Sequence, residues 1–291
     1  MTILVTGSTG AIGSRVVADL AAKGARVLAL ARSPEKAQFP SGVTPVKADL
    51  MDLEATGKAI AQASTLFLLN AVTPDELTQA LLTLSLAREA GVKGVVYLSV
   101  FNAGLFPEVP HFTGKYAVER MIEECDLPAT ILRPNYFMQN DVAMKDAIMG
   151  HGFYPQPIGS TGVSMVDARD IAEIAAARLL ARENAAAPLP RETIELVGPD
   201  VLTGAAVAKI WSEVLGREVH YGGDDLVAFE KQVAAFIPAW MARDLRLMFA
   251  RFHQHGMAAK PEAVARMTAL IGHAPRTYRD FAAETAKAWQ S

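Results

Sequence analysis

The amino-acid sequence predicts an α/β protein built on a doubly wound, parallel, Rossmann-like sheet. Three observations predict this fold. Short β-branched segments alternate with longer segments of helical periodicity through the first half of the chain. The short segments are almost continuously apolar, as expected for strands that are covered on both faces. A glycine-rich turn joins the first predicted strand to the first predicted helix. Strands that alternate with helices of this length imply right-handed crossovers between parallel strands.

The elements follow in order along the chain. We predict strands at 3–6, 26–30, 43–47, 65–69, 95–99 and 130–132, and helices between them at 12–23, 53–63, 76–90 and 115–125. The glycine- and proline-containing segment 150–157 is predicted to be a loop. After it we expect a helix from about 167, a strand at 194–197, a helix at 203–216 and further helices from 224 onward. We therefore expect a dinucleotide-binding domain at 1–150 and a smaller, α-rich, substrate-covering lobe at 151–291, of which about 160–200 returns to the sheet.

Composition excludes several classes of protein. The chain has 291 residues, of which 51% are hydrophobic and 20% charged, as in a globular protein with a substantial core. Its formal net charge of −3 gives no electrostatic reason to bind nucleic acid or an anionic membrane. The single cysteine, Cys125, rules out an intramolecular disulfide, and we predict no metal site. Neither a signal peptide nor an apolar run of roughly 20 residues is present, so we expect a cytoplasmic protein.

The glycine turn is the most informative segment. Gly7, Gly10 and Gly13 are spaced by three, directly after a predicted strand and at the start of a predicted helix. In a dinucleotide-binding turn, the first glycine permits the tight turn and the second lets the backbone approach a pyrophosphate. The third lets the helix and strand pack closely, and the amide groups that open the helix then face the phosphates. The context on both sides favours a dinucleotide site over a simple strand-to-helix turn.

The end of the second strand favours NADP(H) over NAD(H). NAD-binding proteins place a carboxylate there to hold the ribose 2′-hydroxyl, whereas this strand ends at Arg32, with Lys36 within reach. A guanidinium group suits a 2′-phosphate. Alternatively, Arg32 is a solvated loop charge, which leaves the cofactor preference open. Asp49 and Leu50 follow the third strand and are expected near the adenine, although Asp49 could equally cap the next helix.

A series of short segments runs in a characteristic order along nearly the whole chain. They are Thr6-Gly7-x-x-Gly10-x-x-Gly13, Arg32-Ser33-Pro34-Glu35-Lys36, Ala48-Asp49, Tyr97-Leu98-Ser99, His111-x-x-x-Lys115-x-x-x-Glu119, Leu132-Arg133-Pro134-Asn135-Tyr136-Phe137-Met138, Val166-Asp167-x-Arg169-Asp170-Ile171-Ala172 and Pro275-Arg276-x-x-x-Asp280-Phe281. In this order they resemble the NmrA-like branch of the atypical short-chain dehydrogenases. That branch includes NADPH-dependent quinone reductases, a triphenylmethane-dye reductase and redox-sensing regulators.

The resemblance implies a sheet of order 3-2-1-4-5-6-7 and a small lobe that closes over the substrate. It also implies the cofactor contacts. At the phosphates it places Gly7, Ser8, Thr9, Ala11, Ile12 and Arg32. Asn70 and Ala71 would border a ribose, and Lys115 would bond the nicotinamide ribose. The residues that would line the nicotinamide pocket are Pro134, Asn135, Tyr136 and Phe137.

The sequence departs from ordinary short-chain dehydrogenases at the catalytic tyrosine. Those enzymes carry a tyrosine one helical turn before the lysine, where the ammonium group lowers the pKa of the phenol. Here that position is His111, and Tyr116 lies on a different face of the helix. His111 either donates a proton or merely caps or lines the entrance. Lys115 is either the ribose ligand or a surface partner of Glu119, and Ser99 either contacts ribose or substrate or simply ends its strand.

These features predict an NADPH-dependent reductase that transfers hydride to a quinone-like or other conjugated aromatic acceptor. Such an acceptor needs positioning more than acid catalysis, so the hydride chemistry rests mainly with the cofactor. A redox-sensing NADP(H)-binding regulator without turnover and a tailoring enzyme of aromatic natural-product biosynthesis are the alternatives. A homodimer is left open. The residues expected at the substrate are Phe101, Asn102, Phe106, Tyr136, Met138 and Phe153.

Overall fold

The computed structural model describes residues 2–290, and its main sheet has seven strands. These strands are β1 (Ile3–Val5), β2 (Val27–Ala31), β3 (Val43–Lys47), β4 (Thr65–Leu68), β5 (Gly94–Leu98), β6 (Ala129–Pro134) and β8 (Glu192–Leu196). Their order is β3-β2-β1-β4-β5-β6-β8, and the pairs from β3 through to β6 are parallel. The predicted order is therefore confirmed, with β8 as the seventh strand of the sheet.

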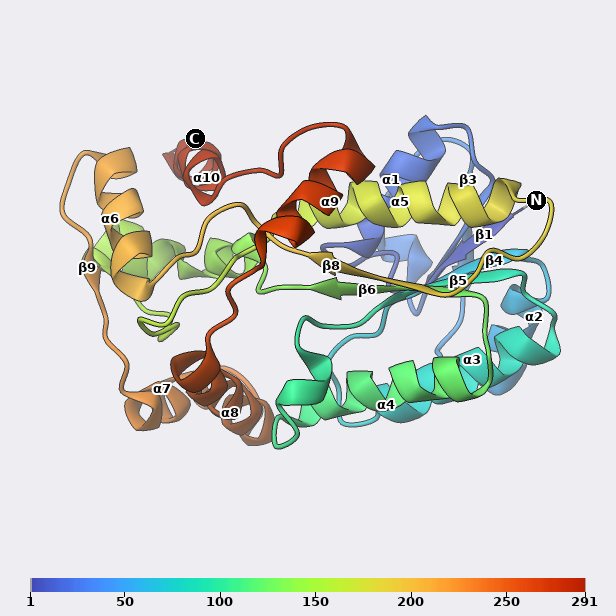
Figure 1. Ribbon diagram of the computed structural model, residues 1–291, viewed down its shortest axis with the longest axis horizontal. Helices are drawn as coiled ribbons and strands as arrows, with labels where there is room; N and C mark the ends of the chain where they lie inside the picture. The colour runs from blue at the N-terminus through green and yellow to red at the C-terminus, as the bar shows by residue number, and fades with distance from the viewer. Residues whose placement is uncertain (1, 291) are drawn as a thin grey trace. The chain divides into compact units, whose positions relative to one another are not determined.

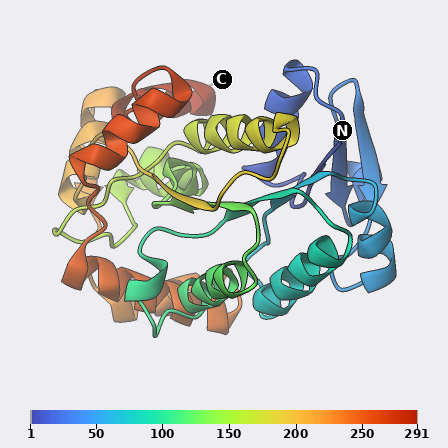
Figure 2. The ribbon, with the colours of Figure 1, turned by 45° about the vertical axis from the view of Figure 1, so that its right-hand side comes forward.

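Helices cover both faces of this sheet, which makes it doubly wound. Figures 1 and 2 show α1 (Gly13–Ala22) and α5 (Ala168–Asn184) on one face. On the other face lie α2 (Leu53–Ile60), α3 (Glu76–Glu89) and α4 (Pro110–Glu124). All residues of β1, β2, β4 and β5 are buried, which explains their continuous apolar sequence. The half-exposed edge strand β3 can contain Pro45 because an edge strand leaves one row of amide groups unpaired.

Two local predictions differ from the structure. Helix α4 begins at Pro110, five residues before the predicted start. Proline is favoured at the first helical position because its missing N–H group would have no partner there. The predicted loop 150–157 contains a short strand, β7 (Phe153–Tyr154), which pairs in parallel with β9 (His220–Tyr221). A two-residue strand lies below what hydrophobic alternation can reveal.

The chain divides into two compact units by the density of its contacts. The first unit comprises the residues up to Ala103, Gly114–Arg133 and Arg169–Glu195. The second unit comprises Gly104–Thr113, Pro134–Ala168 and the residues from Leu196 onward. The sheet strands β1 to β5 belong wholly to the first unit.

Helices dominate the second unit. Besides the short helical segments η3 (Met138–Met144) and η4 (Asp146–Gly150), they are α6 (Gly204–Leu215), α7 (Leu226–Val233), α8 (Ala239–His255), α9 (Pro261–Ile271) and α10 (Tyr278–Gln290). Trp211 of α6 stacks on Trp289 of α10, with ring centroids 5.0 Å apart. Phe229 of α7 meets Phe249 of α8 edge to face at 5.2 Å. Aromatic contacts of this kind stabilise the helix pairs beyond their buried area.

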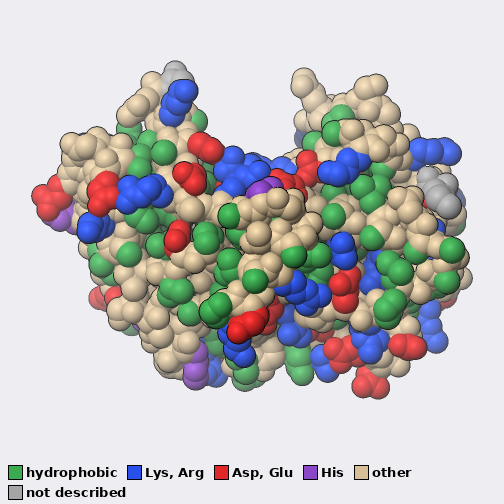
Figure 3. Space-filling view, turned by 45° about the horizontal axis from the view of Figure 1, so that its top comes forward, with side chains coloured by type: hydrophobic (Ala, Val, Ile, Leu, Met, Phe, Trp, Pro, Cys, Tyr) green, Lys and Arg blue, Asp and Glu red, His purple; other side chains and the backbone are tan. Residues whose placement is uncertain are grey.

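The surface carries both signs of charge. On the face shown in Figure 3, acidic and basic side chains are intermixed, in keeping with the net charge of −3. Among residues 2–290, every helix is too short or too polar to cross a lipid bilayer.

Candidate functional site: a glycine turn, a buried lysine and a histidine–aspartate pair

The glycine turn between β1 and α1 requires glycine at two positions. Gly7 has φ +59°, a left-handed conformation that side chains disfavour. A Cβ atom at Gly13 would lie 2.1 Å from the carbonyl oxygen of Gly7, so the first residue of α1 packs directly on the turn. At Gly10, an added Cβ would meet only that same oxygen, at 3.3 Å. Gly10 is exposed, and its outer side is therefore free to receive a ligand.

The start of α1 has the properties of an anion site. The helix begins at Gly13 without a side-chain cap and with no acidic residue in its first turn. Uncapped N–H groups at a helix start, together with the helix dipole, favour a phosphate. Thr9 and Ala11 are exposed beside it, whereas Ile12 is buried. The hydroxyl group of Ser8 donates a 2.8 Å hydrogen bond to the carbonyl of Leu30, so this side chain joins the turn to β2.

Arg32 stands exposed just after β2, at the same edge of the sheet as the glycine turn. Its charge is one of the causes that lower the pKa of Asp75, after the hydrogen bonds from Gln79 and Thr73. Lys36 is also exposed, at the end of a short 3-10 helix, η1 (Pro34–Lys36). Two cations are therefore available beside the turn.

Asp49 does not cap the next helix. Its carboxylate accepts a hydrogen bond from the amide of Met51, 2.9 Å away, and so closes a local turn after β3. The cap of α2 is Asp52, which accepts from the amide of Ala55 at 3.0 Å. The capping alternative for Asp49 is therefore wrong, and its exposed position beside the half-buried Leu50 is compatible with the predicted adenine contact.

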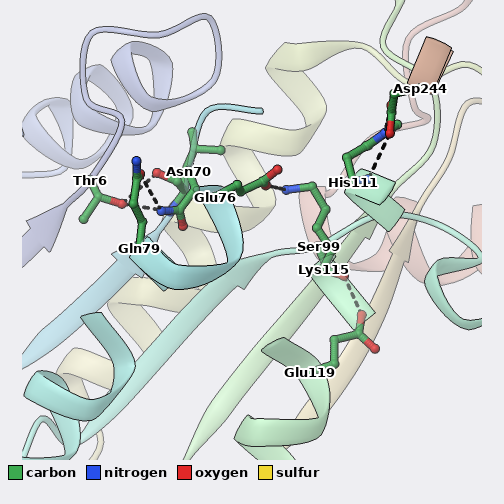
Figure 4. A network of polar contacts seen from close by, with 10 residues as sticks. Thr6, Asn70, Glu76, Gln79, Ser99, His111, Lys115, Glu119 and Asp244 are labelled. Carbon is green, nitrogen blue, oxygen red and sulfur yellow. Dashed lines mark hydrogen bonds and ion pairs between the residues drawn. The ribbon is translucent and has the colours of Figure 1, made fainter. Parts of the chain in front are cut away.

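Asn70 follows β4 and carries a polar atom without a partner. Its side chain is 6% exposed, and its Nδ2 lies 3.4 Å from Oε1 of Gln79 (Figure 4). Its Oδ1 atom is buried and accepts no hydrogen bond from the described residues. A buried oxygen in this state is costly unless a ligand or water supplies a donor. Ala71, the next residue, is exposed.

Lys115 is buried and forms an ion pair with Glu76. Its Nζ atom lies 2.6 Å from Oε1 of Glu76, the first residue of α3, and the two side chains are 10% and 11% exposed. The structure therefore excludes the predicted alternative of a surface pair between Lys115 and Glu119. The ion pair with Glu76 fixes the orientation of the Lys115 side chain.

Glu119, one turn further along α4, belongs to a different contact. Its carboxylate accepts a 2.5 Å hydrogen bond from Oγ of Ser99 and a bond from each of two nitrogens of Arg133, at 3.0 and 2.6 Å. Ser99 is buried at the end of β5, so its hydroxyl is directed to α4. Burial, followed by the charges of Glu76 and Glu119, raises the pKa of Tyr97 well above its usual value. Tyr97 is 2% exposed and is thus a core residue.

His111 lies in the first turn of α4, one turn before Lys115. Its backbone N–H donates to Oδ1 of Asp244 at 3.1 Å, and its ring Nδ1 contacts Oδ2 of the same carboxylate. Helical spacing places His111 and Lys115 on one side of α4. The ring of Tyr116 instead lies under the guanidinium of Arg120, 4.6 Å from ring centroid to carbon. His111 and Lys115 therefore lie one helical turn apart on α4.

The residues after β6 belong to the second unit. The Nδ2 of Asn135 donates to the carbonyl of Met257 at 2.7 Å, which orients that segment. Tyr136 contacts Phe249 and Phe252, with ring centroids 6.0 Å apart in both cases. Pro134 is buried and Phe137 is half-buried.

The predicted substrate residues are mostly buried. Phe101, Phe106 and Met138 are at most 5% exposed, and Phe106 stacks on Phe112 at 5.2 Å. Asn102 and Phe153 are half-buried, and Asn102 has φ +58°.

A model of the NmrA-like family matches residues 1–282. This chain belongs to the NmrA-like family. It is 30% identical over 294 residues to an NAD(P)H azoreductase of Xenophilus azovorans, with 99% of each chain covered. It is also 30% identical to (4-alkanoyl-5-oxo-2,5-dihydrofuran-3-yl)methyl phosphate reductase of Streptomyces griseus, again with 99% of each chain covered. Its fold is similar to that of an NADPH-dependent quinone oxidoreductase from Escherichia coli solved with NADPH (TM-score 0.85, 23% identity, 97% and 99% coverage).

Sequence analysis of this NmrA-like chain missed two acidic residues. Glu76 binds Lys115 from 39 positions away, and Asp244 binds His111 from 133 positions away. No spacing rule connects residues so far apart. The one available signal was Asp244 itself, an acidic residue on the face of α8 whose other buried members are Ala242, Met248, Phe249 and Phe252.

Proposed function

We propose that this NmrA-like chain is an NADP(H)-dependent reductase that passes hydride to a quinone-like or other conjugated aromatic acceptor. The observation that carries the proposal is the uncapped glycine turn at the start of α1, with Arg32 at the same edge of the sheet. Phosphate-bearing dinucleotides bind at such turns because amide groups and the helix dipole stabilise the pyrophosphate.

Three features of the first unit fit the cofactor. The outer side of Gly10 is open to a pyrophosphate. The exposed guanidinium of Arg32 and the ammonium of Lys36 suit a 2′-phosphate, because both are cationic donors. The unpartnered Oδ1 of Asn70 can accept a hydrogen bond from a ribose hydroxyl.

We propose the following roles for the protein groups, as the family resemblance implies. The amides of the turn hold the pyrophosphate, and Lys115 holds the ribose next to the nicotinamide while Glu76 keeps its amine oriented. When bound, the nicotinamide supplies the hydride. The residues that we propose along the nicotinamide are Pro134, Asn135, Tyr136 and Phe137.

We infer the class of acceptor from the names of two relatives and from the lack of a tyrosine one helical turn before Lys115. An azoreductase and a furanone-phosphate reductase act, by their names, on conjugated acceptors. Conjugated acceptors are electrophilic and gain less from a strong general acid than a simple ketone does. This agrees with His111 at the position of the usual tyrosine. The residues that we propose near the acceptor are Phe101, Asn102, Phe106, Tyr136, Met138 and Phe153.

Arg32→Ala is expected to weaken binding of NADPH by about 10- to 100-fold, the loss expected when one charged hydrogen-bonding partner is removed. Binding of NADH should change by less than about twofold, because NADH has no 2′-phosphate for the guanidinium to contact. Isothermal titration calorimetry with both cofactors measures this difference. Arg26→Ala is the matched control, since Arg26 is also exposed but precedes β2, at its opposite end. Equal losses for NADPH and NADH in Arg32→Ala would remove Arg32 from this role.

Lys115→Met is expected to lower turnover about tenfold or more, because the buried bond to the ribose is lost while much of the side-chain volume remains. The measurement is NADPH oxidation at 340 nm with a panel of quinones, azo dyes and enones. Glu76→Gln is the paired variant, since it breaks the ion pair but keeps the amine. Equal losses of turnover in Lys115→Met and Glu76→Gln would show that turnover depends on the ion pair and not on the amine of Lys115 itself.

The same panel decides between catalysis and sensing. Stabilisation of the wild-type protein by NADPH without oxidation of NADPH by any acceptor would favour the redox-sensing regulator. Turnover confined to polycyclic aromatic intermediates would favour the tailoring enzyme.

A further inference from the structure

The contact between α8 and the start of α4 joins one carboxylate to one histidine at two points. Asp244 accepts the backbone N–H of His111 at 3.1 Å and contacts the ring Nδ1 with its second oxygen (Figure 4). The side chain of Asp244 is 1% exposed and that of His111 is 13% exposed. Both residues belong to the second unit, so the contact lies within one compact body.

The buried carboxylate of Asp244 lies on an otherwise apolar face of α8. The other buried residues of α8 are all apolar, so Asp244 stands alone among them. A buried carboxylate is costly unless a charged or hydrogen-bonding partner compensates for its lost hydration. A cap for the first turn of α4 would need only the contact with the backbone. The second contact, to Nδ1, is therefore the feature that requires an explanation.

We infer that Asp244 is a positioning residue that keeps Nδ1 of His111 protonated, so that Nε2 is the atom that exchanges a proton with the reduced acceptor. The inference rests on the proposed function and assigns its proton step. A carboxylate bonded to one imidazole nitrogen fixes the tautomer and favours the imidazolium form.

The proton is needed only by some acceptors. When a quinone, an azo dye or an enone gains a hydride, it gains two electrons and one hydrogen nucleus and becomes an anion. Nε2 of the His111 imidazolium then gives its proton to that anion, and the imidazole regains a proton from solvent. A cationic triarylmethane dye becomes neutral when it gains the hydride alone, so no proton is required.

The other charged side chains around this contact have partners of their own. Arg251 of α8 is bonded to Glu108, with 2.7 Å between Nη2 and Oε2, and it also contacts His255. Other pairs on these elements include Arg246 with Glu230 (2.6 Å), Arg243 with Glu230 (3.4 Å), Lys115 with Glu76 (2.6 Å) and Arg133 with Glu119 (2.6 Å). Asp244 is therefore the charge that most directly controls His111.

The first test is NMR of the imidazole nitrogens in the full, cofactor-free chain, which does not depend on turnover. His111→Gln assigns the signals by their disappearance. We expect the neutral ring to carry its proton on Nδ1 in the wild type. In Asp244→Asn, the carbonyl oxygen of the new side chain can still accept the backbone N–H of His111, and its NH2 group then faces Nδ1, so we expect the ring proton to move to Nε2 while the helix cap is kept. A wild-type ring protonated on Nε2, or an unchanged tautomer in the variant, overturns the inference.

The second test compares two acceptors in the same variants. Asp244→Asn and His111→Gln should lower kcat about tenfold with a quinone or azo dye, which is less than the usual contribution of a positioned acid because these acceptors gain less from protonation. With a cationic triarylmethane dye, kcat should stay within about twofold of wild type. Glu108→Gln is the matched control, because it breaks the neighbouring tie to α8 and should leave both rates unchanged. Equal losses of kcat with both acceptors overturn the inference about Asp244. Absence of wild-type turnover with any acceptor overturns the proposed function alone, and the NMR result then decides whether Asp244 positions His111.

Discussion

Gly13→Ala is expected to lower the free energy of unfolding by about 3 kcal/mol or more and to abolish measurable binding of NADPH. The added Cβ would lie 2.1 Å from the carbonyl oxygen and 2.7 Å from the carbonyl carbon of Gly7. Both are backbone atoms, so the helix or the turn must move, at the upper end of the cost of overpacking. Movement of the turn also displaces the amides proposed to hold the pyrophosphate. Urea denaturation of the cofactor-free protein and calorimetry with NADPH measure the two effects.

Gly10→Ala separates the effect on folding stability from the effect on NADPH binding. Its Cβ would meet only the carbonyl oxygen of Gly7 at 3.3 Å and would otherwise point to open space. We therefore expect a change of less than about 1 kcal/mol in the free energy of unfolding, but a large loss of affinity for NADPH. Normal affinity in Gly10→Ala would place the dinucleotide elsewhere, and a Gly13→Ala protein of wild-type stability would contradict the packing argument.

Asp141 is expected to make the free energy of unfolding fall as pH rises from about 4 to about 7. Burial raises the pKa of this carboxyl from 3.8 to about 7, although hydrogen bonds from Tyr278 and Tyr154 oppose the shift. Both hydroxyls donate to Oδ2, at 2.5 and 3.1 Å, and Oδ1 is buried without a hydrogen-bond partner among residues 2–290. The hydroxyl of Tyr278 itself accepts from Nε1 of Trp211 at 3.0 Å, which anchors the network to α6.

The sign follows from proton linkage. Between the unfolded pKa near 4 and the folded pKa of about 7, the folded state holds one proton that the unfolded state has lost. The contribution of the Asp141 carboxyl to the free energy of unfolding is therefore fully present below about pH 4 and is lost by about pH 7. A shift of about three units corresponds to about 4 kcal/mol. Asp141→Asn, which cannot ionise, should remove this part of the pH dependence.

The measurement is the difference in free energy of unfolding between wild type and Asp141→Asn at pH 4.5, 6 and 8. We expect wild type to lose stability relative to the variant as pH rises. Asp146→Asn, at an exposed carboxyl in the adjacent helical segment, is the control and should follow wild type. A difference between wild type and Asp141→Asn that is constant with pH would show that Asp141 ionises normally in the folded state.

Local patterns were sufficient for most of the fold. The apolar strands, the periodic helices and the glycine turn identified the parallel sheet because each depends on residues close together in sequence. The order of the strands came from the family resemblance, since local patterns do not say which strands are neighbours. The same holds for Arg32 after β2 and for His111 one turn before Lys115. Errors occurred where a short element depends on distant contacts. Strand β7 forms because Phe153 pairs with His220, and no local sequence pattern predicts this pairing.

The partners of the chemically important side chains required the folded chain. Sequence alone left Lys115 with Glu119 as a candidate partner, since helical spacing makes that pair possible, but folding brings Glu76 to the lysine and gives Glu119 to Ser99 and Arg133. Likewise, the sequence shows His111 four residues before Lys115 but gives no indication that α8 brings Asp244 into contact with it. Periodicity encodes which way a side chain points from its own element, whereas hydrogen bonds and ion pairs depend on which elements the tertiary packing brings together.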